Sequence, residues 1–162
     1  MYKQKLTLGV APVKRSFLSM EEAKRQKDKF MAVIRNIKPD AVEIVDVDDQ
    51  CENGIMWDTA KVPGVVEKFR RAGVDALFIP FCDFGEEQVA AQIAAAFKLP
   101  TLVWGARDER PNSDEARGRD TQCGMFAATK VLRRHGVKYS YIYNCETESD
   151  DFKNGYENFL RV

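Results

Sequence analysis

The chain has 162 residues, about the size of one domain, and its 44% hydrophobic and 31% charged composition is that of a folded globular protein. Twenty-five Lys and Arg residues balance 25 Asp and Glu residues, and this zero net charge argues against binding of nucleic acid or an anionic membrane through bulk electrostatics. No apolar run reaches the roughly 18 residues that a membrane span needs, and Lys14 and Arg15 interrupt the N-terminal apolar patch too early for a signal peptide. We therefore expect a cytoplasmic protein with no membrane partner.

The chain alternates between short apolar segments that favour strands and longer amphipathic segments that favour helices. In chain order, the predicted elements are a strand over 6–11, a helix that begins after Ser19 and ends before Pro39, a strand over 41–47, a helix from about 62 to Gly73, a strand over 75–80, a helix from 85 onward, a strand over 102–104, a helix over 121–135, a strand over 139–143 and a helix over 150–160. The third strand is too continuously apolar to have one face in water, which favours a central position in a parallel sheet.

Polar residues and glycines mark the ends of several predicted helices. Ser19 and Glu22 have the spacing of a capping box, and we expect Asp83 and Glu86 to cap the third helix in the same way. Gly73 suits the left-handed conformation that often ends a helix.

Five strands alternating with five helices predict βαβ units and a parallel sheet covered by helices on both faces. Short right-handed connections then favour an α/β fold with a three-layer, doubly wound, five-stranded parallel sheet of flavodoxin-like (Rossmann-like) topology, in a single domain over residues 1–162. Ligands of such sheets bind beyond the carboxyl ends of the strands. The segments expected at that edge are 11–17, 48–54, 80–85, 104–120 and 144–150.

The last predicted helix has an apolar stripe formed by Phe152, Tyr156, Phe159 and Leu160, and no chain follows Val162 to cover it. We therefore expect the sequence to be a piece of a longer protein, cut in its last helix. A naturally short protein is the alternative, which the sequence leaves open.

The cysteines and the single histidine limit the chemistry of the chain. The four cysteines form no C-x-x-C pair, so we expect reduced thiols, and one histidine argues against a zinc site. Cys82 and Cys123 are each predicted at a helix N-terminus, where the helix dipole lowers the pKa of a thiol. Two such thiols facing one cleft could move protons at a substrate carbon. The alternative interpretation is that both are small, buried packing residues.

A highly charged connection over 105–120 is longer than most connections in compact domains, and such loops are often functional. Its arginines, together with Arg15, could clamp an anion or a polyhydroxylated ligand, but its interleaved carboxylates fit a solvated loop with internal ion pairs equally well. Trp57 and Trp104 are either sugar-stacking platforms or partly buried apolar residues. The chain lacks both G-x-G-x-x-G after the first strand and G-x-x-x-x-G-K-[ST], which excludes nucleotide binding by those motifs.

Four segments at these strand ends carry a resemblance to a known family. They are LGVAPVKR at 8–15, VDALFIPFCDFG at 74–85, VWGARDE at 103–109 and RDTQCG at 119–124. In this order they resemble the N-terminal domain of the L-fucose isomerase-like and L-arabinose isomerase-like sugar isomerases. The resemblance covers all 162 residues, which correspond to the opening section of the family's longer chains.

The resemblance implies aldose–ketose interconversion through a cis-enediol, with Mn²⁺ holding the sugar oxygens and carboxylates moving the protons. The family's metal ligands, two carboxylates and a histidine, belong to later domains, so we expect no cofactor in this chain and Mn²⁺ in the complete protein. The family's N-terminal domain contributes to subunit contacts in a homo-oligomer and helps to cover a neighbouring subunit's sugar site. The residues that match its covering loops and their rim are Arg15, Cys82, Asp83, Phe84, Trp104 and Arg107.

The expected partners are therefore a small sugar, the later domains of the protein and neighbouring subunits, with no nucleic acid. Phe81 and Cys82 stand where fucose isomerases can place a tryptophan, so the sequence does not identify the sugar. Two other functions remain open. A free-standing flavodoxin-like module that binds a small polar ligand would be a stable monomer with its last helix packed on its own sheet. A thiol-based racemase or isomerase would use Cys82 and Cys123.

Overall fold

The computed structural model describes residues 5–110 and 118–161. The elements, in chain order, are β1 (Leu6–Val10), α1 (Met20–Arg35), β2 (Val42–Val45), the short 3₁₀ helices η1 (Glu52–Gly54) and η2 (Thr59–Lys61), α2 (Val62–Ala72), β3 (Ala76–Phe81), α3 (Glu87–Phe97), β4 (Thr101–Gly105), α4 (Thr121–Arg134), β5 (Ser140–Tyr141) and α5 (Asp150–Phe159). The alternation of strands and helices predicted from the sequence is confirmed.

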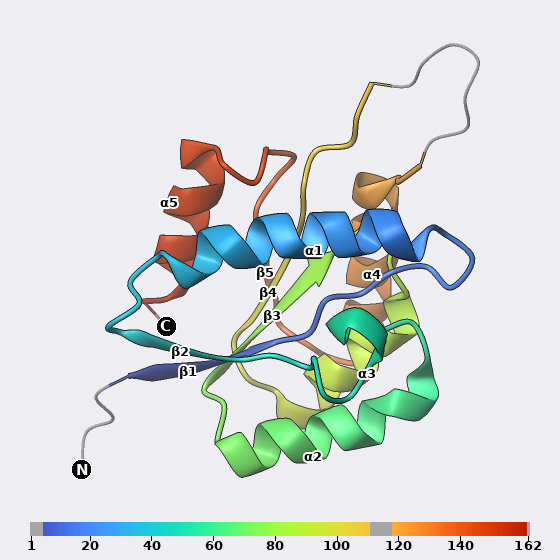
Figure 1. Ribbon diagram of the computed structural model, residues 1–162. Coiled ribbons are helices and arrows are strands. Elements are labelled where there is room, and N and C mark those ends of the chain that lie inside the picture. The colour runs from blue at the N-terminus through green and yellow to red at the C-terminus, as the bar shows by residue number, and fades with distance from the viewer. Residues whose placement is uncertain (1–4, 111–117, 162) are drawn as a thin grey trace.

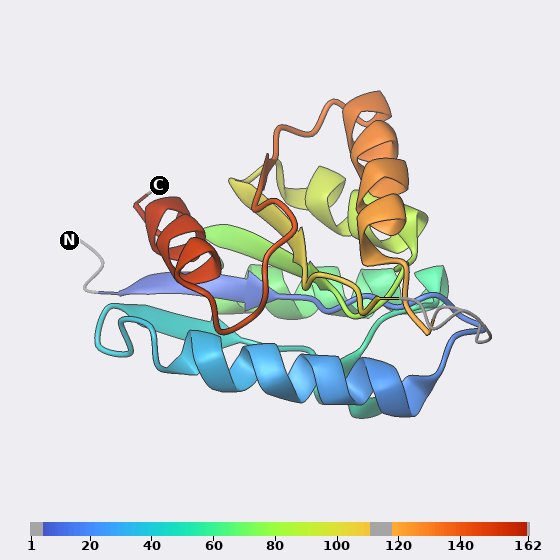
Figure 2. The ribbon, with the colours of Figure 1, turned by 90° about the horizontal axis from the view of Figure 1, so that it is seen from above.

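The strands form one parallel sheet in the order β2-β1-β3-β4-β5, with β3 at its centre (Figure 1). Helices α1 and α5 cover one face of the sheet, and α2, α3 and α4 cover the other (Figure 2). This strand order with helices on both faces is the flavodoxin-like, doubly wound topology, so the predicted fold class is correct. No helix within the described residues is long and apolar enough to cross a membrane.

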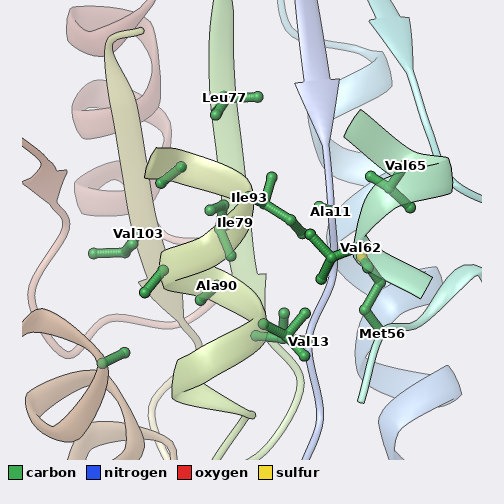
Figure 3. Close-up of a cluster of buried hydrophobic side chains, with 14 of the residues drawn as sticks. Ala11, Val13, Met56, Val62, Val65, Leu77, Ile79, Ala90, Ile93 and Val103 are labelled. Carbon is green, nitrogen blue, oxygen red and sulfur yellow. The ribbon is translucent and has the colours of Figure 1, made fainter. Parts of the chain in front are cut away.

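β3 holds the two hydrophobic cores together because all six of its residues are buried. Leu77 and Ile79 belong to the buried cluster that also contains Val62 of α2 and Ile93 of α3 (Figure 3). Phe78 projects to the opposite face, toward α1 and α5. A strand buried on both faces has a continuous apolar sequence, and this pattern is why the sequence indicated a central position for β3.

The last helix packs on the sheet of its own chain. The ring centroids of Phe152 and Trp104 are 4.2 Å apart, and those of Tyr156 and Phe78 are 5.5 Å apart. Phe152, Tyr156 and Phe159 are all buried, and Leu160 is half-buried. The expectation of an uncovered apolar stripe is therefore wrong, because the α1 face of the sheet accepts it.

The two edge strands are shorter than predicted. β5 keeps only Ser140–Tyr141 paired with β4, and β2 keeps Val42–Val45. An edge strand forms backbone hydrogen bonds with one neighbouring strand, so it ends where the two strands move apart. The helix ends agree better with prediction. Ser19 accepts a hydrogen bond from the Glu22 backbone, and Gly73 has φ of 63°.

Replacing Phe152 with Ala should lower the free energy of unfolding by about 3–5 kcal/mol, because the change leaves a cavity between α5 and the sheet. Urea unfolding measures this loss. The control Phe17→Ala, at a side chain that is 83% exposed, should change it by less than about 0.5 kcal/mol. A Phe152→Ala loss as small as that of the control would contradict the packing of α5 in the core.

Candidate functional site

The chain beyond β1 runs between its two neighbours and brings their loops together at the carboxyl edge of the sheet. Val13 forms isolated parallel bridges with Met56 on one side and Phe81 on the other. The Lys14 amide donates to the Met56 carbonyl at 2.9 Å, and the Cys82 amide donates to the Val13 carbonyl at 2.9 Å. β1 leads to α1 and β3 leads to α3, on opposite faces. This divergence is the topological switch point, where doubly wound sheets bind their ligands.

Asp83 joins the loop after β1 to the loop after β3. Its Oδ1 accepts hydrogen bonds from the Arg15 amide at 2.7 Å and from the Gly85 amide at 2.8 Å. The side chain is 1% exposed, and within the described residues its Oδ2 has no hydrogen-bond donor. Burial raises the pKa of this carboxyl, and the two amides and the nearby Lys14 charge offset only part of that effect.

Lys14 is buried beside Asp83 and stabilises the turn that follows β1. Its ammonium group donates to the carbonyl oxygens of Arg15 at 2.6 Å and Ser16 at 3.3 Å. A lysine with its charge satisfied by backbone oxygens fixes the path of the turn. The loop that carries Arg15 is therefore held from two sides, by Lys14 and by Asp83.

The Arg15 side chain lies across the start of α3. Its two terminal nitrogens pair with Glu86 at 2.9 Å and Glu87 at 2.7 Å, and its Cζ lies 4.5 Å from the centre of the Phe84 ring. The side chain keeps 16% of its surface exposed. The structure thus brings together the predicted residues Arg15, Asp83 and Phe84, and adds two carboxylates as partners of the guanidinium group.

The first turn of α4 supports the Phe84 loop from behind. A Cβ atom on Gly124 would overlap the carbonyl oxygen of Phe84, so only glycine permits this approach. Gly85 adopts φ of 73°, and a Cβ there would overlap the Phe81 ring. The two glycines therefore fix the backbone on both sides of the exposed part of Phe84.

The start of α4 is capped from the connection after β4. Asp108 accepts hydrogen bonds from the Thr121 amide at 2.9 Å and the Thr121 hydroxyl at 2.5 Å. The predicted Asp83–Glu86 cap of α3 is wrong, because Asp83 accepts hydrogen bonds from the Arg15 and Gly85 amides and the Glu86 side chain makes no capping hydrogen bond with the described residues of α3. No local pattern indicated Asp108 as a cap, because the residue lies 13 positions before Thr121, the first residue of the helix that it caps.

Arg119 ties the same connection to the domain. Its guanidinium group is 3% exposed, pairs with Glu109 at 3.0 Å and donates to the Arg107 carbonyl at 2.7 Å. Arg107 instead donates to the Asn144 carbonyl at 2.7 Å, at the carboxyl end of the β5 segment. These contacts favour the interpretation of internal ion pairs for the described part of the connection. Residues 111–117 lie outside the described residues.

Two of the predicted site residues are core residues in the structure. Trp104 is fully buried, and its indole N–H donates to the Cys145 sulfur at 3.4 Å, so it cannot serve as a sugar platform at the surface. Cys82 is also fully buried, in the core on the α1 and α5 face. Trp57 is the tryptophan that remains accessible, 40% exposed beside a hollow of about 240 Å³.

The thiol-based racemase is contradicted by the placement of its two cysteines. Burial raises the pKa of the Cys82 thiol, the opposite of the activation expected at a helix N-terminus. Cys123 is exposed on α4, which covers the other face of the sheet. The two sulfurs therefore do not face one cleft.

The described residues do not fit a metal centre. Across residues 5–110 and 118–161, no three His, Cys, Asp or Glu side chains gather as a set of metal ligands. The carboxylates of the site have other partners, because Asp83 accepts two backbone amides through Oδ1 and Glu86 and Glu87 pair with Arg15. What the edge offers a ligand is a guanidinium group, an aromatic ring and backbone polar groups.

Comparison with protein-family models matches residues 9–162 to the model described as the N-terminal domain of fucose/sulfoquinovose isomerase. No curated protein sequence matches the chain. Among solved structures, the lysine decarboxylase LdcF of Francisella novicida aligns at 11% identity and a TM-score of 0.44, over 98% of this chain and 18% of that enzyme's length. The azoreductase of Bacillus anthracis str. Sterne aligns at 11% identity and a TM-score of 0.44, over 98% of both chains.

Replacing Gly124 with Ala should lower the free energy of unfolding by about 1–3 kcal/mol and displace Phe84, because a Cβ at this position overlaps backbone rather than a flexible side chain. Chemical denaturation measures the loss. The matched control is Gly64→Ala in the first turn of α2, where a Cβ would meet only the end of the Gln50 side chain. That variant should be neutral or slightly more stable. Equal effects of the two substitutions would contradict the support given to Phe84 by α4.

Replacing Asp83 with Asn should keep the acceptor for both amides and remove a buried charge. Because the folded-state pKa of Asp83 is raised above the unfolded value of about 3.9, its contribution to stability is present at lower pH and lost as pH rises through the folded pKa. The variant should therefore gain stability relative to the wild type as pH rises from about 4 to 7. Urea unfolding across this range measures the difference. A variant that loses stability relative to the wild type as pH rises would contradict the raised pKa of Asp83.

Proposed function

This chain belongs to the fucose/sulfoquinovose isomerase N-terminal domain family, and we propose that it is the N-terminal domain of an aldose–ketose isomerase that acts on a small sugar. The observation that carries the proposal is the family match over residues 9–162. In this proposal the chain is one domain of a longer protein. Its role is to cover the sugar site of a neighbouring subunit in a homo-oligomer and to form contacts between subunits.

The covering surface is the carboxyl edge at the switch point between β1 and β3. Asp83 holds the backbone of Arg15 and of the turn after Phe84, and Glu86 and Glu87 hold the Arg15 guanidinium group, so the positions of Arg15 and Phe84 are set before a sugar arrives. Phe17, in the loop that follows Arg15, is 83% exposed.

The chemistry that Arg15 and Phe84 offer suits a polyhydroxylated ligand. A guanidinium group donates several hydrogen bonds in a planar fork, which matches neighbouring sugar hydroxyls, and an aromatic ring packs against the apolar face of a sugar ring. The Glu86 and Glu87 carboxylates hold the guanidinium plane in place while its exposed part remains available. Arg15 would therefore orient the substrate and would not move protons.

The metal-dependent step belongs elsewhere in this proposal. The described residues of this chain do not gather a ligand set for Mn²⁺, so we derive no step through the metal here. When bound in the later domains, Mn²⁺ would hold the sugar oxygens and stabilise the enediolate charge. This domain would bind and orient the sugar, and this orientation lowers the barrier of the step that the later domains catalyse.

One observation favours a second candidate. The last helix packs on its own sheet, as a free-standing flavodoxin-like module for a small polar ligand would require. Such a module would use the same switch-point edge and the hollow beside Trp57. It would bind its ligand without any other domain.

The test is the Arg15→Ala variant of the complete isomerase. Loss of charge-assisted hydrogen bonds to the sugar should reduce kcat/KM by about 10- to 100-fold, with unchanged bound Mn²⁺. Arg71→Ala is the control, because Arg71 is exposed on α2 and its one ion pair with a described residue is with Glu67, one turn away. It should leave kcat/KM unchanged. An Arg15→Ala enzyme with full kcat/KM would overturn the covering role, and sugar binding by this chain alone would favour the second candidate.

A further inference from the structure

One face of the molecule, far from the switch point, is basic and aromatic. The stretch 121–144 contains four basic residues and no acidic residue, although the whole chain has equal numbers of both. It forms α4 and β5. Its basic residues are exposed and form no ion pair with any described residue: Lys130, Arg133, Arg134 and Lys138.

Large aromatic side chains stand beside these charges. Phe126 is 69% exposed, Tyr141 is 61% exposed and Tyr143 is 69% exposed. Together with Met125 and Tyr139 they line a hollow of about 230 Å³ between α4 and β5, and a second hollow reaches from Phe126 to Arg133 and Arg134. Single exposed aromatic residues are ordinary, but a contiguous group with a polar rim marks an interaction surface.

This surface, which we call the basic edge (residues 126–143), includes a free sheet edge. β5 pairs with β4 on one side and is the last strand of the sheet. Its outer backbone groups have no partner strand within the described residues. Free strand edges that carry apolar side chains are sites where a further strand or chain adds.

The opposite edge of the sheet has the opposite charge. The stretch 40–58 contains seven acidic residues and no basic residue. It begins at β2, the other end of the strand order, and Figure 2 shows cyan β2 and orange α4 on opposite sides of the molecule. Asp46, Asp48 and Asp49 pair with basic residues of α1 and α2.

The remaining carboxylates at this edge are available to a partner. Asp40, Glu43 and Glu52 are exposed, and none forms an ion pair with a described residue. Val42 and Ile44 of β2 are half-buried at the same free edge. We call residues 40–52 the acidic edge. The two edges of one sheet therefore combine apolar side chains with charges of opposite sign.

We propose that the basic edge of one copy of this chain binds the acidic edge of a second copy. The two edges of one molecule lie at opposite ends of its sheet and cannot meet each other, so the contact is between copies and is heterologous. This inference rests on the proposed function in one respect, because it names the surface through which subunits of the isomerase meet. Charge complementarity fixes the register, and the tyrosines and Phe126 provide the buried area.

A second copy fits this surface better than a nucleic acid does. A nucleic-acid site would place its basic residues over a whole face of a basic domain, whereas this chain has zero net charge and its own acidic counterpart. The basic edge and acidic edge are also both strand edges, which a nucleic acid does not extend.

The experiment is a charge exchange followed by sedimentation velocity. The 162-residue chain is used because α5 completes its core. The triple variant Lys130→Glu, Arg133→Glu, Arg134→Glu leaves one basic and three acidic residues on the basic edge. The triple variant Asp40→Lys, Glu43→Lys, Glu52→Lys makes basic the three exposed carboxylates of the acidic edge that have no ion pair within the described residues. All six residues are exposed, so circular dichroism should be unchanged.

The wild type should self-associate at concentrations up to about 1 mM, and association should weaken at least tenfold when salt is raised from about 0.05 to 0.5 M. Each triple variant alone should be monomeric, because its two edges then carry the same charge sign. An equimolar mixture of the two should associate again, because every contact in the mixture joins opposite charges. Arg70→Glu, Arg71→Glu in the last turn of α2 is the matched control and should associate like the wild type.

Three results would overturn the proposal: a wild type that is monomeric throughout this range, variants that associate as well as the wild type, or a mixture that stays monomeric. Binding of a single-stranded oligonucleotide at the basic edge without self-association would also overturn it, in favour of a nucleic-acid surface. None of these results bears on the Arg15→Ala measurement, which concerns the carboxyl edge of the sheet. A failure here is therefore distinguishable from a failure of the proposed sugar-covering role.

Discussion

The buried carboxylate of Asp83 joins two loops that the sheet brings together but does not connect. One oxygen accepts the amides of Arg15 and Gly85, and this places the Arg15 guanidinium group over Phe84 and between Glu86 and Glu87. The raised pKa of the carboxyl shows that the arrangement has an electrostatic cost, which the backbone donors and the Lys14 ammonium reduce. A site of this kind is ordered before its ligand binds, as an orienting surface needs.

The fold could be predicted from the sequence because the patterns that indicate strands and helices are local. Apolar runs such as 75–80 and the cap at Ser19 are read within a few residues, and their alternation leaves one common topology. The errors concern contacts between distant segments. Phe152 seemed uncovered because its partner, Trp104, is 48 positions earlier, and Asp83 seemed a helix cap because its donor, Arg15, is 68 positions earlier. Cys82 has the position of an activated thiol in the sequence, but its burial depends on the packing of α1 and α5.

Different edges of the sheet are proposed to have different roles. The carboxyl edge carries the ordered Arg15 and Phe84 and is the surface proposed to cover a sugar site. The basic edge and the acidic edge, at the two ends of the sheet, carry charges of opposite sign beside exposed or half-buried apolar side chains, and they are the surfaces proposed to join copies. A domain that uses separate edges for assembly and for substrate can place its loops over a neighbour's site without sacrificing its own core. Family membership, shown by the match over residues 9–162, gives both surfaces a context in a sugar isomerase.

The most direct measurement is a crystal structure of the complete isomerase with a bound sugar. The account predicts that the Arg15 guanidinium group and the Phe84 ring contact a sugar held mainly by another subunit, with Asp83 still bonded to the Arg15 and Gly85 amides. A sugar enclosed entirely by other domains, with Arg15 and Phe84 facing solvent in every subunit, would contradict it.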